Sequence, residues 1–371
     1  MLTTDTNDGG EFFEPSDVTD SFGGFTLDVF ARDSANSAKV IIKTHSNKRC
    51  VDSFTKTKPG MLTLRAPIHA SVITPLTTVA DEIASVYMIT VERAAKLILE
   101  SFGLTEESID SDLIFNVDPF QKLVIDGDDS LATVAYASVN LANAISMISS
   151  LLHGAGTLNK AEAEAATLFA FAQRIGETNL ISRKKRRKLL GEYYAKSFLN
   201  VSDSSDISSI ISLAVSIVSR TSPDVSVDTE TKNMVARASA MASSYLLSSA
   251  SNTTSNDSGE EILKNCAAAI KVIQDPELLE AIVDFGKAKS SATTLITDLE
   301  YSEKFEAAKE FVSVLIPQYP PPPSPNLPNL PSPSTPALTF EISGASALLN
   351  RVAWTIWLSF TLAFAASLWE L

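Results

Sequence analysis

The chain has 371 residues, of which 45% are hydrophobic and 20% are charged, so it can form a core and is not a disordered polymer. Its formal net charge of −14 argues against a nucleic-acid-binding protein, which normally presents a basic face to phosphates. Two cysteines and three histidines exclude a disulfide-dense scaffold and a cysteine-rich zinc site. No motif for catalysis or for phosphate, metal or cofactor binding occurs, so we expect a non-enzymatic protein without a cofactor.

The first 34 residues contain eight acidic residues and a single cation, Arg32. Such a stretch repels itself, and we therefore expect residues 1–21 to form a disordered acidic tail. Met1 is followed by polar residues rather than by a basic and then an apolar stretch. The sequence as given thus shows no secretory signal peptide.

Residues 22–70 are predicted to form a small β segment, because apolar and polar residues alternate in short runs. Expected strands lie around Leu27, at Val40 to Ile42 and at Met61 to Leu64. These strands are too few and too short for a large domain. We expect them to lean on the segment that follows.

From Thr74 onward the apolar period becomes helical, and the chain is predicted to be α-helical in two regions, 71–152 and 153–316. Thr74-Pro75 is a helix start, since threonine caps free N–H groups and proline is tolerated at the first helical position. Similar signals predict helices beginning at Thr90, Asp128 or Asp129, Asn159, Asp206, Met234, Glu261, Pro276 and Tyr301, with a loop at 248–259. The apolar faces predict that Leu76, Val79, Ile83, Leu97, Ile98 and Val139 are buried. The fold class expected is mainly α.

Residues 317–340 are predicted to be a proline-rich linker, because ten of the 17 prolines lie within 317–336. Such a composition favours an extended polyproline II rod. The following tail, 341–371, contains 18 successive residues without a charge, 352–369. As a helix this segment is ~27 Å long, close to the thickness of the hydrocarbon core of a bilayer. Its larger apolar residues fall on no single face, which favours a membrane helix over a buried core helix; we expect the membrane to contact Val352, Trp354, Trp357, Phe360, Phe364 and Trp369.

The tail has two interpretations that the sequence leaves open. Ser343, Gly344 and Ala345 are three successive small residues, followed by a short spacer and the apolar segment. That order is typical of a GPI-attachment signal, although the spacer is shorter and less polar than usual. The other interpretation is a plain C-terminal membrane helix.

N-x-S/T sequons occur at Asn200, Asn252 and Asn256, and the last two fall in the predicted loop, where a glycan could be attached. A run of six cations at 183–188 could be a nuclear-import signal, an anionic-surface patch or a protease site; we favour a solvated helical turn. The acidic run that begins at Asp126 lacks the glutamate that closes a calcium-binding loop and is better explained as a helix cap. Cys50 and Cys266 could be bridged in an oxidising compartment, but the sequence does not show that they meet.

The stretch Val72-Ile73-Thr74-Pro75-Leu76-Thr77-Thr78 resembles the opening of a helical module found in large extracellular surface proteins of bacteria and algae. The resemblance covers about residues 40–152 and includes a preceding strand like Leu62 to Pro67. It implies no activity. The proline-rich linker is similar to the hydroxyproline-rich spacers of green-algal and plant wall glycoproteins.

These features together predict a cell-surface or wall-associated protein of structural or adhesion type. Its helical body would stand on a proline-rich stalk, with the membrane bound by the tail and with contacts to wall polysaccharide or glycoprotein, but not to nucleic acid. This interpretation requires that the true start of the chain precedes Met1. The alternative is a cytosol-facing, tail-anchored adaptor on an organelle membrane, which needs no signal peptide and in which the cations at 183–188 would touch anionic lipid.

Overall fold

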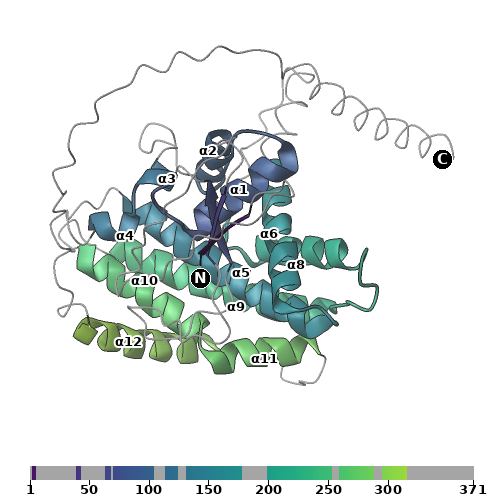
Figure 1. Ribbon diagram of the computed structural model, residues 1–371. Helices are drawn as coiled ribbons and strands as arrows, with labels where there is room; N and C mark the ends of the chain where they lie inside the picture. Colours follow the sequence, from purple (N-terminus) through teal and green to yellow (C-terminus); the bar gives the residue numbers. More distant parts are fainter. Residues whose placement is uncertain are drawn as a thin grey trace, which may run out of the picture. The chain divides into compact units, whose positions relative to one another are not determined.

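The computed structural model describes residues 2–5, 39–42, 63–67, 70–103, 113–123, 131–177, 199–252, 259–287 and 295–315. Within these ranges the protein is mainly α-helical, as predicted, with one small β-sheet (Figure 1). The chain divides into two units, Met1–Tyr319 and Pro320–Leu371. The second unit, with most of the expected polyproline rod and all of the C-terminal helix, lies outside the described residues.

The sheet consists of three antiparallel strands in the order β1 (Leu2–Asp5), β2 (Lys39–Ile42) and β3 (Leu64–Pro67). Strand β2 confirms the predicted strand, whereas β3 begins three residues later than the predicted one. Strand β1 corrects the expectation that residues 1–21 are disordered throughout. The backbone groups of Leu2–Asp5 pair with the edge of β2, and the local charge of the segment does not reveal such pairing.

Helices α1 (Pro75–Tyr87) and α2 (Val91–Ser101) begin where the capping signals predict. The Thr74 and Thr90 hydroxyls accept hydrogen bonds from backbone N–H groups of the first helical turns. The α1–α2 turn passes through Met88, which has a φ of 51°. Gly103, with a φ of 75°, follows α2 in the conformation that a glycine stop supplies.

Two short helices, α3 (Leu113–Asn116) and α4 (Pro119–Gln121), precede the long helix α5 (Ala132–Ala155). The predicted aspartate cap of α5 is wrong. Leu131 stands at the N-cap position without a side-chain hydrogen bond, so the helix begins beyond both aspartates. The start of α5 therefore has no side-chain cap, and the residue at this position, Leu131, is buried.

The second half of the body is an array of helices: α6 (Lys160–Gly176), α8 (Ser204–Val218), α9 (Thr229–Asn252), α10 (Gly259–Ile273), α11 (Pro276–Gly286) and α12 (Asp298–Leu315). The predicted starts at Asn159 and Pro276 are confirmed. Helix α8 begins earlier than predicted, with Asp203 rather than Asp206 as its cap. Helix α9 continues through Asn252, so the first part of the predicted loop at 248–259 is helical instead.

Helix α5 occupies the centre of the body and packs against α6, α9, α10 and α11 (Figure 1). Among the described residues it is the one helix that is long and apolar enough to cross a membrane, and most of its surface is buried inside the protein. The predicted region boundary at 152 falls inside α5, and helices from both regions share one hydrophobic core. All six residues predicted from the apolar faces to be buried are buried.

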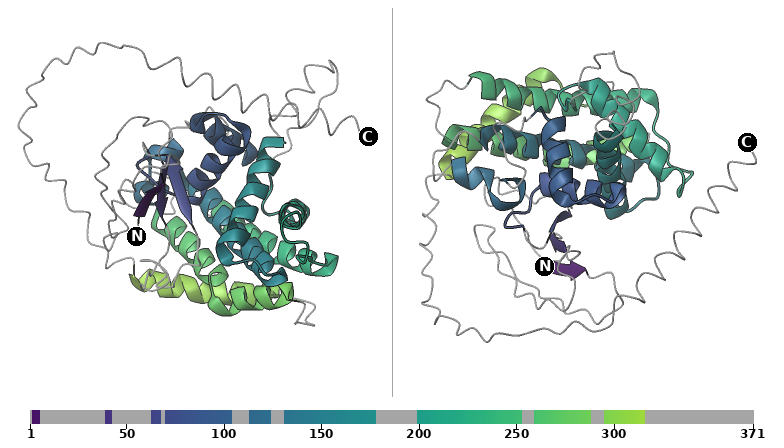
Figure 2. Two further views of the ribbon diagram at one scale, coloured as in Figure 1. Left: turned by 45° about the vertical axis from the view of Figure 1, so that its right-hand side comes forward. Right: turned by 90° about the horizontal axis from the view of Figure 1, so that it is seen from above.

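Close approach of backbones joins α5 to α11. A Cβ atom on Gly154 would lie 2.0 Å from the carbonyl oxygen of Val283, and one on Gly286 would lie 2.4 Å from the carbonyl oxygen of Leu151. Neither position has room for any side chain, so two glycines on facing helices permit the crossing. On another side of the body, β3 lies against α1 (Figure 2).

Candidate functional site at the strand–helix junction

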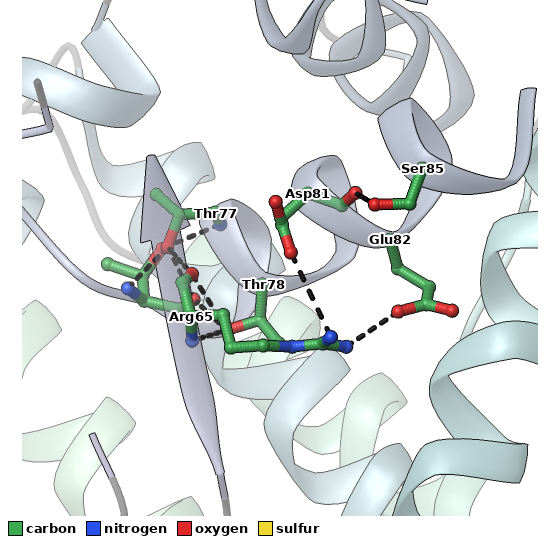
Figure 3. Close-up of polar contacts among 7 residues, drawn as sticks. Arg65, Thr77, Thr78, Asp81, Glu82 and Ser85 are labelled. Atoms are coloured by element: carbon green, nitrogen blue, oxygen red, sulfur yellow. Dashed lines mark hydrogen bonds and ion pairs between the residues drawn. The ribbon is translucent and has the colours of Figure 1, made fainter. Parts of the chain in front are cut away.

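A polar junction attaches β3 to α1, and two threonines of the Thr-Pro-Leu-Thr-Thr stretch form its centre (Figure 3). The Thr78 hydroxyl oxygen accepts a hydrogen bond from the Arg65 N–H at 2.9 Å. The Thr77 hydroxyl lies 3.0 Å from the Arg65 carbonyl oxygen and within donating distance of it. Both side chains are almost wholly buried. The helix thus supplies a donor and an acceptor to the backbone of one strand residue.

The Arg65 side chain extends the junction along the next turn of α1. Its Nη2 donates to Glu82 Oε2 at 2.6 Å, and its Nη1 lies 3.9 Å from Asp81 Oδ2 (Figure 3). Asp81 is only 2% exposed. A guanidinium beside two carboxylates balances a buried negative charge that would otherwise be expensive to bury.

Glu164, on α6, brings a third carboxyl group to the same strand. Its Oε1 accepts a hydrogen bond from the Thr63 N–H at 2.5 Å, immediately before β3. The residue is 3% exposed, and its Oε2 has no hydrogen-bond partner among the described residues. Burial raises the pKa of Glu164 to about 7, while the Thr63 N–H and the charge of Arg65 act in the opposite direction. We call Thr63, Arg65, Thr77, Thr78, Asp81, Glu82 and Glu164 the strand–helix junction.

The side chains of the strand–helix junction attach β3 to the helices. Its threonine hydroxyls bond to backbone groups and its arginine is paired with carboxylates. Across the residues that the structure describes, no group of three or more His, Cys, Asp or Glu residues could hold a metal ion. The arrangement can fix the β-sheet on the helices, and burial raises the pKa of Glu164 to about 7, so that this carboxyl group titrates near neutral pH.

Asn200 is the one predicted glycosylation residue whose side chain the structure describes. It is exposed, and its Oδ1 accepts hydrogen bonds from the N–H and the hydroxyl of Ser202, the third residue of the same sequon. Its own N–H donates to Asp206, which also pairs with Arg174 at 3.0 Å. Asn200 is therefore held at the surface by a turn whose backbone is fixed to α8.

The other predicted site residues are not brought together. Asn252 is the last residue of α9 rather than part of a loop, and Asn256 lies outside the described residues. Ser343, Gly344, Ala345, the segment 352–369 and the cations at 183–188 also lie outside them. Cys266 is free and fully buried, which raises the pKa of its thiol, and Cys50 is not among the described residues.

Sequence reasoning missed Arg65 and Glu164 as partners of the threonines. A signal for Glu164 was available: it stands three residues before Thr167 and seven before Phe171, on the face of α6 that becomes buried. A carboxyl group on an apolar helical face requires a partner. The identity of that partner, the strand that begins 100 residues earlier in the chain, depends on tertiary packing.

Comparison of the chain with models of protein families, with curated proteins and with solved structures gave no match.

Proposed function

We propose that this chain is a non-enzymatic, membrane-anchored protein of the cell surface or wall, in which a helical body is carried on a proline-rich stalk. The observation that carries the proposal is the uncharged segment at 352–369, which follows a stretch of 20 residues that contains ten prolines. Along the chain the helical body comes first, the proline-rich stalk second and the uncharged segment last. In that order the stalk would hold the body away from the membrane. The long apolar helix of the body, α5, is already accounted for as the centre of the core.

Two properties of the body support a display role. The Thr-Pro-Leu-Thr-Thr stretch, which resembles a surface-protein module, is used here to fix a strand to a helix. The net charge of −14 keeps such a body soluble and repels like-charged surfaces. Contacts with wall polysaccharide or glycoprotein would then be made by the exposed faces of the body.

The test is removal of residues 352–371 from the full-length chain expressed in eukaryotic cells. We expect the full-length protein in the membrane fraction after a carbonate wash and the truncated protein in the soluble fraction. The reason is that each CH₂ group withdrawn from water contributes about 0.8 kcal/mol, and this segment is uncharged throughout and mostly apolar. If the full-length protein is itself soluble without detergent, the proposed anchor does not exist.

A tail-anchored adaptor that faces the cytosol is the alternative, and the six cations at 183–188 favour it, because the cytosolic leaflet is anionic. Glycosylation separates the two orientations. A display protein expressed with its native upstream sequence should carry a glycan on Asn200, Asn252 or Asn256, which glycosidase treatment reveals as a change in gel mobility. Unmodified peptides from all three sequons in a membrane-bound protein would establish the cytosolic orientation.

A further inference from the structure

The core contains uncharged polar side chains with buried atoms that have no hydrogen-bond partner among the described residues. They lie on three helices that pack on one another, α5, α9 and α10. The atoms concerned are Oδ1 of Asn140, Oδ1 and Nδ2 of Asn143, Oγ of Ser239, Oγ of Ser243 and Oδ1 of Asn265. Each of these residues is at most 2% exposed.

The helix contacts show that these groups belong to one region. Along α5, residues 140 and 143 are neighbours on one side of the helix, and on α9 the two serines are separated by one turn. The start of α10 lies against Leu123, ahead of α5, where a Cβ on Gly259 would be 1.8 Å from the leucine carbonyl oxygen. At its other end, Gln274 donates to Ser146 of α5 at 2.6 Å.

Helix α10 therefore runs in the same direction as α5. Asn265 stands nine residues before Gln274, and Asn140 stands six residues before Ser146. With a rise of ~1.5 Å per residue, the two amides differ in level by about one helical turn. The polar groups of α5 and α10 thus lie within about one to two helical turns of each other along the core. Helix α9 packs against both helices.

We infer that the interface of α5, α9 and α10 is an internal binding site for ordered water molecules. Buried polar atoms without partners cost free energy, and native proteins satisfy nearly all of them. The unpartnered atoms include both hydrogen-bond donors and hydrogen-bond acceptors, and this combination restricts which ligand can bind. Asn143 offers both a donor and an acceptor, and the serine hydroxyls can act as either, so the ligand must donate and accept hydrogen bonds. A cation would satisfy only the oxygens and an anion only the donors; water satisfies both.

Substitutions distinguish hydrated groups from groups that are simply unsatisfied. Ser243→Ala removes one hydroxyl oxygen, and Asn143→Leu keeps the branching and the number of side-chain heavy atoms while it replaces both polar atoms by methyl groups. If water binds these atoms, both variants leave the water and its other partners with fewer hydrogen bonds, and we expect a lower Tm. The matched control is Ser244→Ala, at the adjacent exposed position of α9, which should raise Tm slightly because alanine is the better helix former.

The unaltered protein provides the second measurement. We expect a crystal structure at a resolution sufficient for ordered water to show density within hydrogen-bonding distance of Asn143 Nδ2 and Oδ1. In solution, cross-relaxation between water and the Asn143 side-chain amide should likewise detect a bound water molecule. The inference is overturned if Ser243→Ala and Asn143→Leu raise Tm at least as much as Ser244→Ala does, or if the region contains no water. Density for an ion or a larger molecule there would also overturn it.

Discussion

Glu164 links the stability of the strand–helix junction to pH. Its carboxyl group is buried against β3, and its pKa is raised from 4.5 in the unfolded chain to about 7 in the folded one. Between these two values the folded protein keeps a proton that the unfolded chain releases. The stabilisation is complete below about pH 4.5 and is lost as the pH rises through 7.

Glu164→Gln should flatten this pH dependence, because glutamine keeps an acceptor for the Thr63 N–H but does not ionise. We expect the free energy of unfolding of the variant, relative to the wild type, to rise by about 2–3 kcal/mol between pH 5 and pH 7.5. Urea titrations at both pH values measure it. Glu303→Gln, at an exposed position of α12, serves as the control and should leave the wild-type pH profile unchanged. Parallel profiles for the wild type and Glu164→Gln would contradict the assignment.

Thr78 has a separate role, because its hydroxyl oxygen is the acceptor for the Arg65 N–H. Thr78→Val keeps the shape of the side chain and leaves that N–H without its partner. We expect a loss of about 1–3 kcal/mol in unfolding free energy and faster hydrogen exchange at the Arg65 amide. Thr78→Ser, which retains the hydroxyl, should restore most of the protection. Equal exchange rates in all three proteins would show that the contact does not hold the strand.

At the scale of elements, the sequence predicts what local chemistry determines. The caps at Thr74, Thr90 and Asn159 are confirmed because each depends on a side chain and an N–H group within four residues. The start of α5 and the strand β1 are missed because no local capping or strand signal marks them: Leu131 has no side-chain cap and belongs to the hydrophobic core, and β1 pairs with a strand more than 30 residues away. The partners of Glu164 are missed for the same reason.

The crossing of α5 and α11 gives a prediction at this scale. Gly154→Ala would place a methyl group against the Val283 carbonyl oxygen, and the helices would have to separate. In an ordinary helix interior this change is favourable by about 1 kcal/mol. Here we expect a net loss of about 1–3 kcal/mol, as for other overpacked cores. Thermal unfolding measures it, with Ser212→Ala on the exposed face of α8 as the control for helix propensity. A rise in Tm for Gly154→Ala would mean that the helices are not in close contact.

At the scale of the whole molecule, the proposed anchor and the body are separable in sequence. Helix α12 ends at Leu315, and the proline-rich stretch begins two residues later. The prediction that 352–369 inserts into a membrane depends only on the composition of this segment and not on the fold of the body. The sequence alone is therefore sufficient to make it. Composition does not distinguish a membrane-spanning helix from a signal that is removed when a lipid is attached.

Arginine in place of Leu358, in the middle of the apolar segment, should weaken membrane insertion by roughly 2.5–3.5 kcal/mol. We expect a larger fraction of this variant in the soluble fraction than of Leu358→Ala. Leu338→Arg, which adds the same charge within the linker, should leave the distribution between fractions unchanged. Identical distributions for Leu358→Arg and the wild type would show that this segment does not enter the bilayer.

A phosphatidylinositol-specific phospholipase distinguishes the two forms of attachment. If the tail is a GPI signal, the enzyme should release a protein that ends at Ser343, Gly344 or Ala345, which mass spectrometry of its C-terminal peptide identifies. Recovery of an intact Leu371 from membranes, with no release by the enzyme, would leave the membrane-spanning helix.

The turn between α1 and α2 gives the protein a chemical reporter of its own folding. Met88 is 93% exposed, whereas Met147, in the middle of α5, is completely buried. Mild peroxide should therefore convert Met88 to its sulfoxide in the native state, while Met147 reacts only when the core opens. The ratio of the two sulfoxide-containing peptides then reports how often the body unfolds, even in samples where optical methods fail.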